Sequence, residues 1–180
     1  GEDTIFEVTD TDADIIWMFD IPNQAGTWPH DAAHCSVLLD GDYVYWANAD
    51  AGLVRRLHKT NGGAPEVVGE SHLPRFLAMD ATHVYWTDFG ADVEEGVALR
   101  APKDPSGESP EEVASSLRRP GGMKILDDQL FIVSRDTGAL YRVPKAGGTA
   151  DILVEGDTDH NLQGWNPVYD GTYLYWFSSP

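Results

Sequence analysis

The chain is poor in the residues that mark several large classes of protein. It has one cysteine, Cys35, so no disulfide can form within it. It has no apolar run of about 18 residues or more, so no helix is expected to cross a membrane. Its 12 Lys and Arg stand against 30 Asp and Glu, a formal net charge of −18. Nucleic acid and membrane insertion are therefore excluded as expected modes of action, and acidity of this kind suits a secreted or periplasmic surface. No Lys/Arg-led signal sequence is present in this chain.

What the chain does contain is a fourfold internal repeat. Its anchors Tyr45, Tyr85, Phe131 and Tyr175 are 40, 46 and 44 residues apart. Each anchor lies in a short apolar and aromatic run, and Gly, Pro and Asp turns separate the runs. A period of this length, filled with short strands, is the size of one four-stranded propeller blade. The sequence therefore predicts an all-β fold, a small β-propeller in one domain over residues 1–180.

The repeat predicts how the blades are divided along the chain. Blade 1 covers about 30–70, blade 2 about 72–117 and blade 3 about 118–160. The fourth is shared: residues 167–180 supply two inner strands and residues 1–21 supply two outer strands. Pairing the two terminal half-blades would close a ring of four blades of four antiparallel strands and leave no open sheet edge. The alternative is half of an eight-bladed dimeric propeller, so the chain is expected to be a monomer or a homodimer.

Charged residues recur with the same period. The third strand of each unit carries Arg56, Arg100 and Arg142, each followed three residues later by Lys59, Lys103 and Lys145. An acid of the first hairpin turn also recurs, as Asp40, Asp80 and Asp170. A charge that repeats with the architecture belongs to the architecture, so we expect exposed outer-strand cations that cap acidic neighbours.

The repeats resemble β-propeller repeats of the YWTD type, on the residues Tyr85-Trp86-Thr87-Asp88. They are also similar to bacterial secreted propeller repeats, which share the Arg-x-Pro-Lys pattern seen at 142–145. The segment from Val8 to Asp20 resembles quinoprotein-type propeller repeats, although Glu7 and Asp10 stand where the other units have Arg and Lys. The YWTD resemblance implies binding of a protein or other ligand through one face and the central channel. Neither resemblance implies a set of catalytic residues in this chain.

Loops that lead into the innermost strands are expected to surround the mouth of the channel. Their polar and aromatic residues could hold an anionic or sugar-like ligand through arginine and tryptophan side chains. The predicted ligand-binding residues are His30, His34, His72, Arg75, Arg118, Arg119, Gln163 and Trp165.

Metal binding is a weaker prediction. Two acidic runs suit a hard cation such as Ca²⁺, through Asp10, Asp12, Asp14, Asp157 and Asp159, but the first run lacks the turn glycine and closing glutamate of a calcium loop. No cofactor is expected, with Ca²⁺ as the alternative.

Three functions remain open at this level. A non-catalytic module that binds a protein or carbohydrate ligand, or serves as a scaffold, is favoured. The second is a polysaccharide lyase or hydrolase that uses His34, His72, Arg75 and Arg119. The third is a designed or recombined propeller with no evolved ligand.

Overall fold

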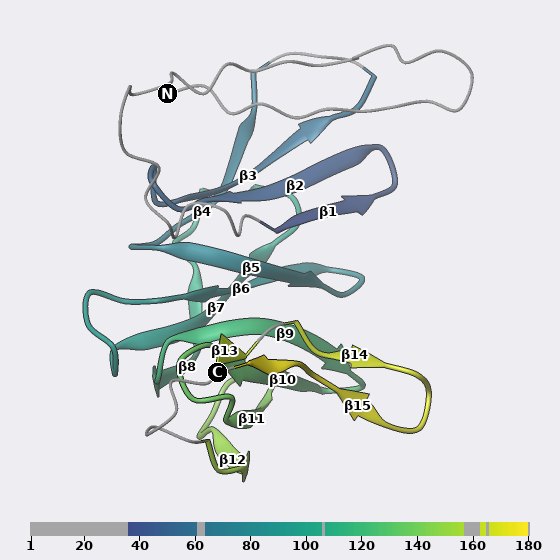
Figure 1. Cartoon of the computed structure of the whole chain (residues 1–180). Coiled ribbons are helices and arrows are strands. Elements are labelled where there is room, and N and C mark those ends of the chain that lie inside the picture. The colour runs from purple at the N-terminus through teal and green to yellow at the C-terminus, as the bar shows by residue number, and fades with distance from the viewer. Residues whose placement is uncertain (1–35, 61–63, 106, 157–162, 165, 180) are drawn as a thin grey trace. The chain divides into compact units, whose positions relative to one another are not determined.

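The structure is a computed structural model in which the described residues form strands, turns and extended connections (Figure 1). The chain divides into a compact unit at 1–33 and another at 34–180, and only the second is described. No helix in this described part is long and apolar enough to cross a membrane. The residues described are 36–60, 64–105, 107–156, 163–164 and 166–179.

Three four-stranded antiparallel sheets follow one another along the chain, each with its strands in sequence order. The first contains β1 (Val37–Asp40), β2 (Tyr43–Asn48), β3 (Leu53–His58) and β4 (Glu66–Glu70). The second contains β5 (Pro74–Met79), β6 (His83–Asp88), β7 (Gly96–Pro102) and β8 (Glu111–Leu117). The third contains β9 (Pro120–Leu126), β10 (Gln129–Ser134), β11 (Leu140–Pro144) and β12 (Asp151–Val154).

A fourth unit begins after the third sheet. Its hairpin pairs β14 (Val168–Tyr169) with β15 (Leu174–Tyr175). Beside it, β13 (Gln163–Gly164) pairs with β16 (Ser178–Ser179). This hairpin occupies the place of the first two strands of a blade.

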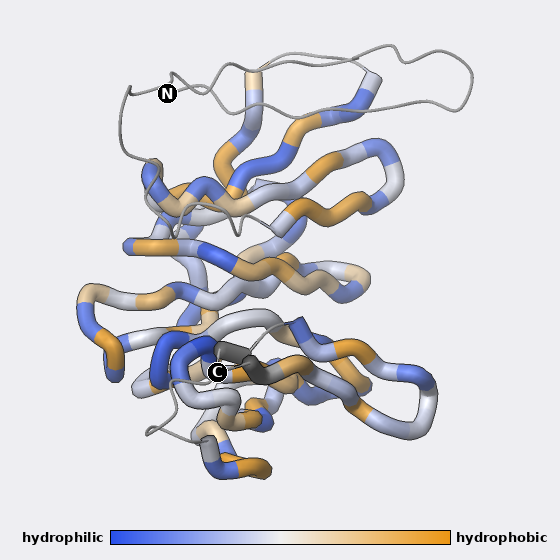
Figure 2. Tube along the Cα trace, in the orientation of Figure 1, coloured by the Kyte–Doolittle hydropathy of each residue, from blue (hydrophilic) through white to orange (hydrophobic). Residues whose placement is uncertain are grey.

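The strand registers confirm the repeat. Tyr45 lies opposite Arg56 in the first sheet, and Tyr85 lies opposite Arg100 in the second. Phe131 lies opposite Arg142 in the third. Aromatic and β-branched residues favour strands, and the Asp and Gly residues between them favour the turns. Figure 2 shows the same division, with apolar residues along the strands and hydrophilic ones at the turns.

The core lies between successive sheets. Strand residues point alternately to the two faces of a sheet, so Trp86 and Tyr85 belong to different clusters. Trp86 packs with Tyr45 between the first and second sheets. Tyr85 packs with Leu130 between the second and third. Each sheet therefore stabilises both of its neighbours.

The architecture is that of a β-propeller, with three blades and the inner hairpin of a fourth among the described residues. The outer strands expected from residues 1–21 lie outside the described residues, so the shared fourth blade remains a prediction. The structure confirms the all-β class, the four-stranded antiparallel unit and the repetition of that unit along the chain.

Candidate functional site

One end of the sheets, here called the loop face, carries the connections that lead into β5 and β9 and those that leave β6 and β10. Phe89 follows β6 on this face and is almost buried. The guanidinium carbon of Arg75 lies 5.0 Å from the centre of its ring, and that of Arg135 lies 5.8 Å from it. Both distances suit a cation–π contact. One phenyl ring thus holds two arginines from different sheets.

Two further arginines lie at the turn between β8 and β9, beside Arg135. Arg118 Nη1 donates to Glu94 Oε1, and Arg119 Nε lies 3.5 Å from Asp136 Oδ2. The backbone fixes the turn on both sides. Arg119 N–H donates to the Val93 carbonyl at 3.0 Å, and Arg135 N–H donates to the Arg119 carbonyl at 2.9 Å.

We call these four side chains the loop-face arginine cluster: Arg75, Arg118, Arg119 and Arg135. Six of the chain's 12 basic residues occupy the two repeat positions, which leaves six others. Four of those six belong to the cluster. Because guanidinium groups bind carboxylates through paired hydrogen bonds, this face suits an acidic ligand.

The structure gives a place to half of the predicted ligand-binding residues. His72 is exposed in the segment that leads into β5, and Arg75 at the start of β5 is buried. Arg118 and Arg119 are half-buried at the β8–β9 turn. Gln163 is described only as part of β13. The remaining predicted residues, His30, His34 and Trp165, lie outside the described residues.

The predicted calcium ligands are likewise outside the described part of the chain: Asp10, Asp12, Asp14, Asp157 and Asp159. Among the residues that are described, no group of three or more His, Cys, Asp and Glu could hold a metal ion. The calcium hypothesis therefore stays a prediction.

Sequence reasoning missed Phe89 and Arg135, although both stand four residues after an anchor, Tyr85 or Phe131. That position falls just beyond the second strand of each blade, on the loop face. The first unit has Ala49 there, so the position varies in chemistry while the strand before it repeats. The sequence signal that could have identified these two residues is a repeat position at the end of a strand whose residue type differs from blade to blade.

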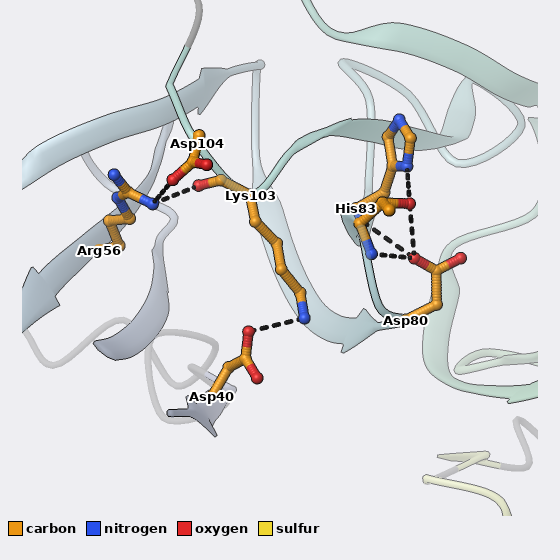
Figure 3. A network of polar contacts seen from close by, with 7 residues as sticks. Asp40, Arg56, Asp80, His83, Lys103 and Asp104 are labelled. Atoms are coloured by element: carbon orange, nitrogen blue, oxygen red, sulfur yellow. Dashed lines mark hydrogen bonds and ion pairs between the residues drawn. The ribbon is translucent and has the colours of Figure 1, made fainter. Parts of the chain in front are cut away.

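The opposite end of the sheets, here called the hairpin face, carries a groove of about 480 Å³ where the first and second sheets meet. Figure 3 shows its ionic groups. Lys103 Nζ donates to Asp40 Oδ2 at 2.7 Å. Arg56 donates to Asp104 at 2.6 Å and to the Lys103 carbonyl at 2.9 Å. It also donates to Glu66 at 2.6 Å. Since these groups satisfy one another, the groove belongs to the join between sheets.

The same join recurs between the second and third sheets. Lys145 Nζ lies 3.1 Å from Asp80 Oδ2, and Arg100 donates to the Lys145 carbonyl at 2.8 Å. The prediction that the repeated cations pair with acids is confirmed for the three arginines and for Lys103 and Lys145, since Arg100 also pairs with Glu111 and Arg142 with Asp151. The prediction that these cations are exposed is wrong for Arg56, which is buried. Two of its acceptors, Asp104 and the Lys103 carbonyl, come from the segment that follows β7 of the second sheet, and Glu66 of its own sheet supplies the third.

Asp80 gives this join a pH dependence. Burial would raise the pKa of its carboxyl, but N–H groups of Thr82 and His83, the Lys145 ammonium and the Tyr85 hydroxyl hold it well below its usual value. A carboxyl whose pKa is lowered by folding stabilises the fold above the unfolded pKa of about 4 and loses this effect as the pH falls further.

Asp80→Asn is therefore expected to lower the free energy of unfolding by about 1–2 kcal/mol at neutral pH. It should also make the loss of stability below about pH 4 less steep. Urea unfolding at a series of pH values measures both effects. Asp128→Asn is the matched control, because that carboxylate is 95% exposed and lies 3.7 Å from the same lysine. An equal response of the two variants would contradict a specific role for Asp80.

Comparison with known proteins identifies structures with a similar fold but assigns the chain to no family. No family model matches the chain, and no curated protein matches it. Its structure is similar to a chain in a crystal structure of a nidogen/laminin complex, with a TM-score of 0.63 and 20% identity. The match covers 80% of this chain and 54% of that one, so the chain spans about half the length of its structural neighbour. An S. cerevisiae assembly of Dbp5 with Nup159 and Gle1 contains a further match, with a TM-score of 0.49 and 12% identity over 80% of this chain and 38% of that one.

Proposed function

We propose that the protein is a non-catalytic binding module that takes an acidic segment of a partner protein on its loop face. The observation that carries the proposal is the loop-face arginine cluster. In a chain with a net charge of −18, four of the six basic residues outside the repeat positions lie on the loop face, two of them on the Phe89 ring and two at the adjoining β8–β9 turn. A chance arrangement of so few cations would scatter them among the many acids.

Different members of the cluster have different parts in this binding. Arg75 is buried against Phe89 and belongs to the floor of the site. The side chain of Arg119 is 42% exposed, and its contact with Asp136 is long at 3.5 Å. Ion pairs of exposed groups contribute little, so a ligand carboxylate can replace Asp136 at small cost. Arg119 is therefore the expected contact, and an aromatic residue of the ligand can stack on its guanidinium plane.

The net negative charge of the chain around the cluster favours a short acidic segment of a protein over a long polyanion as the ligand. A long polyanion would be repelled by the net charge of the chain, whereas a short acidic segment need only meet the cluster. A solved structure with a similar fold contains a nidogen/laminin complex, which supports a protein partner for this chain as well.

The test is binding of a labelled peptide in which consecutive glutamates adjoin a tyrosine, followed by fluorescence anisotropy. Arg119→Glu is expected to weaken binding by about tenfold, because it removes an ion pair and sets a negative charge against the glutamates of the peptide. Arg142→Glu makes the same change of charge on β11, where the guanidinium is 44% exposed and pairs with Asp151. It should leave binding unchanged.

A peptide with glutamines in place of the glutamates separates charge recognition from contact with the tyrosine. Equal affinity for the two peptides would contradict the proposal, as would equal effects of the two arginine variants. Circular dichroism of each variant shows whether the fold is kept, so a loss of binding with an intact spectrum refers to the site.

A further inference from the structure

The last hairpin exposes side chains that the preceding blades bury. Tyr175 is 50% exposed, whereas Tyr45 and Tyr85 at the same repeat position are 1% and 2% exposed. At the other end of the described unit, Val37 is 54% exposed, whereas Leu77 at its repeat position is 5% exposed. Both uncovered surfaces are apolar, and each lies where a neighbouring blade would pack.

The joins inside the chain show which of these residues would meet. Tyr45 of the first sheet shares a core cluster with Leu77 of the second. Tyr85 of the second shares a cluster with Met123 of the third. Because Val37 occupies the position of Leu77 and Met123, the same geometry would pack Val37 against Tyr175.

The ionic contacts point to the same pairing. In both observed joins, the turn aspartate of one sheet binds the lysine of the next: Asp40 binds Lys103 and Asp80 binds Lys145. Asp170 is the turn aspartate of the last hairpin, and Lys59 is the corresponding lysine of the first sheet. The repeat therefore predicts that Lys59 forms an ion pair with Asp170 when these two surfaces meet.

Asp170 already has the geometry of Asp80. Its carboxylate accepts N–H groups of Thr172 and Tyr173, each at 2.8 Å, and the hydroxyl of Tyr175 at 3.0 Å. Asp80 accepts the corresponding N–H groups and the Tyr85 hydroxyl. Within the described part of the chain, Asp170 forms no ion pair with a lysine or arginine. Asp170 therefore has the hydrogen bonds of Asp80, but among the described residues no cation takes the place of Lys145 beside it.

We propose that a second copy of this chain covers the last hairpin, with its Val37 on Tyr175 and its Lys59 on Asp170. In the described part of one chain both apolar surfaces stay exposed, so the first sheet and the last hairpin of that chain do not cover each other. Two copies related by a twofold axis would make this contact twice and complete one ring from two half-rings. Burial of these surfaces and two ion pairs would stabilise the dimer.

The experiment is zero-length crosslinking with a carbodiimide, which joins a lysine to a carboxylate in direct contact. Equal amounts of unlabelled and ¹⁵N-labelled full chain are mixed, crosslinked and digested, and the linked peptides are weighed by mass spectrometry. The pairs Lys103–Asp40 and Lys145–Asp80 serve as internal controls, because they lie within one chain and must carry one isotope. A link between Lys59 and Asp170 is expected with mixed isotopes.

The mass in solution gives a second measurement. Light scattering is expected to show twice the chain mass of 19.8 kDa. Asp170→Asn keeps the turn acceptor and removes the charge, and it should weaken the dimer by about tenfold. Asp128→Asn is the matched control and should not change it. A Lys59–Asp170 link found only with single isotopes would overturn the proposal in favour of a ring closed within one chain, because half of the links between two copies would carry mixed isotopes. Absence of this link beside the two control links, or a single-chain mass, would also overturn it.

Discussion

Replacement of Trp86 by alanine is expected to lower the free energy of unfolding by about 3–5 kcal/mol. The side chain is fully buried and packs with Tyr45 and Val68 between the first and second sheets. Its indole N–H donates to Ser71 Oγ at 3.0 Å. The alanine variant loses the apolar contacts, leaves a cavity between two sheets and deprives the serine hydroxyl of its donor.

Urea unfolding followed by far-ultraviolet circular dichroism measures this effect. Tyr173→Ala is the control, since that aromatic side chain is 64% exposed on the last hairpin and should change stability by less than about 0.5 kcal/mol. Trp86→Phe should lie between the two, because it keeps part of the volume and loses the hydrogen bond. A loss below about 1 kcal/mol for Trp86→Ala would show that the join between sheets is not the main source of stability.

Gly96→Ala is expected to be the next most damaging change, at about 1–3 kcal/mol. Gly96 begins β7, and an added Cβ would lie 2.5 Å from the Leu117 carbonyl oxygen and in collision with the ring of Pro120. Both obstacles belong to the backbone or to a rigid ring, so neither can move aside as a flexible side chain would. The two strands must separate or shift their register.

Thermal unfolding of Gly96→Ala and of Ser115→Ala tests this prediction. Ser115 is an exposed residue of β8, the strand that pairs with β7, so its substitution should leave the melting temperature almost unchanged. If Gly96→Ala melts as the parent protein does, the close approach of β7 to the β8–β9 turn is not required for folding.

The joins explain why substitutions at these two positions should act on the whole molecule. Trp86 links the second sheet to the first, and Gly96 allows the second sheet to meet the start of the third. Each blade alone is a small sheet with two apolar faces, which is marginal in water. Loss of one join therefore exposes apolar surface on two blades at once.

The sequence by itself determined the blade and its repetition. The spacing of Tyr45, Tyr85, Phe131 and Tyr175, with turn residues between them, was enough because strand alternation and turn preference are local properties. The repeated Arg, Lys and Asp residues were also visible as a pattern. What they bind was not, because Lys103 and Asp40 are 63 residues apart and meet only when two sheets pack.

Only the tertiary structure decided how the functional surface is built. Phe89 and Arg135 belong to different sheets, and their contact depends on how far one blade turns relative to the next, which no local preference encodes. The same packing buried Arg56 and left Tyr175 exposed, although both occupy regular repeat positions. A repeat defines each blade by short-range forces, whereas burial, ion pairing and the binding face arise from the contacts between blades.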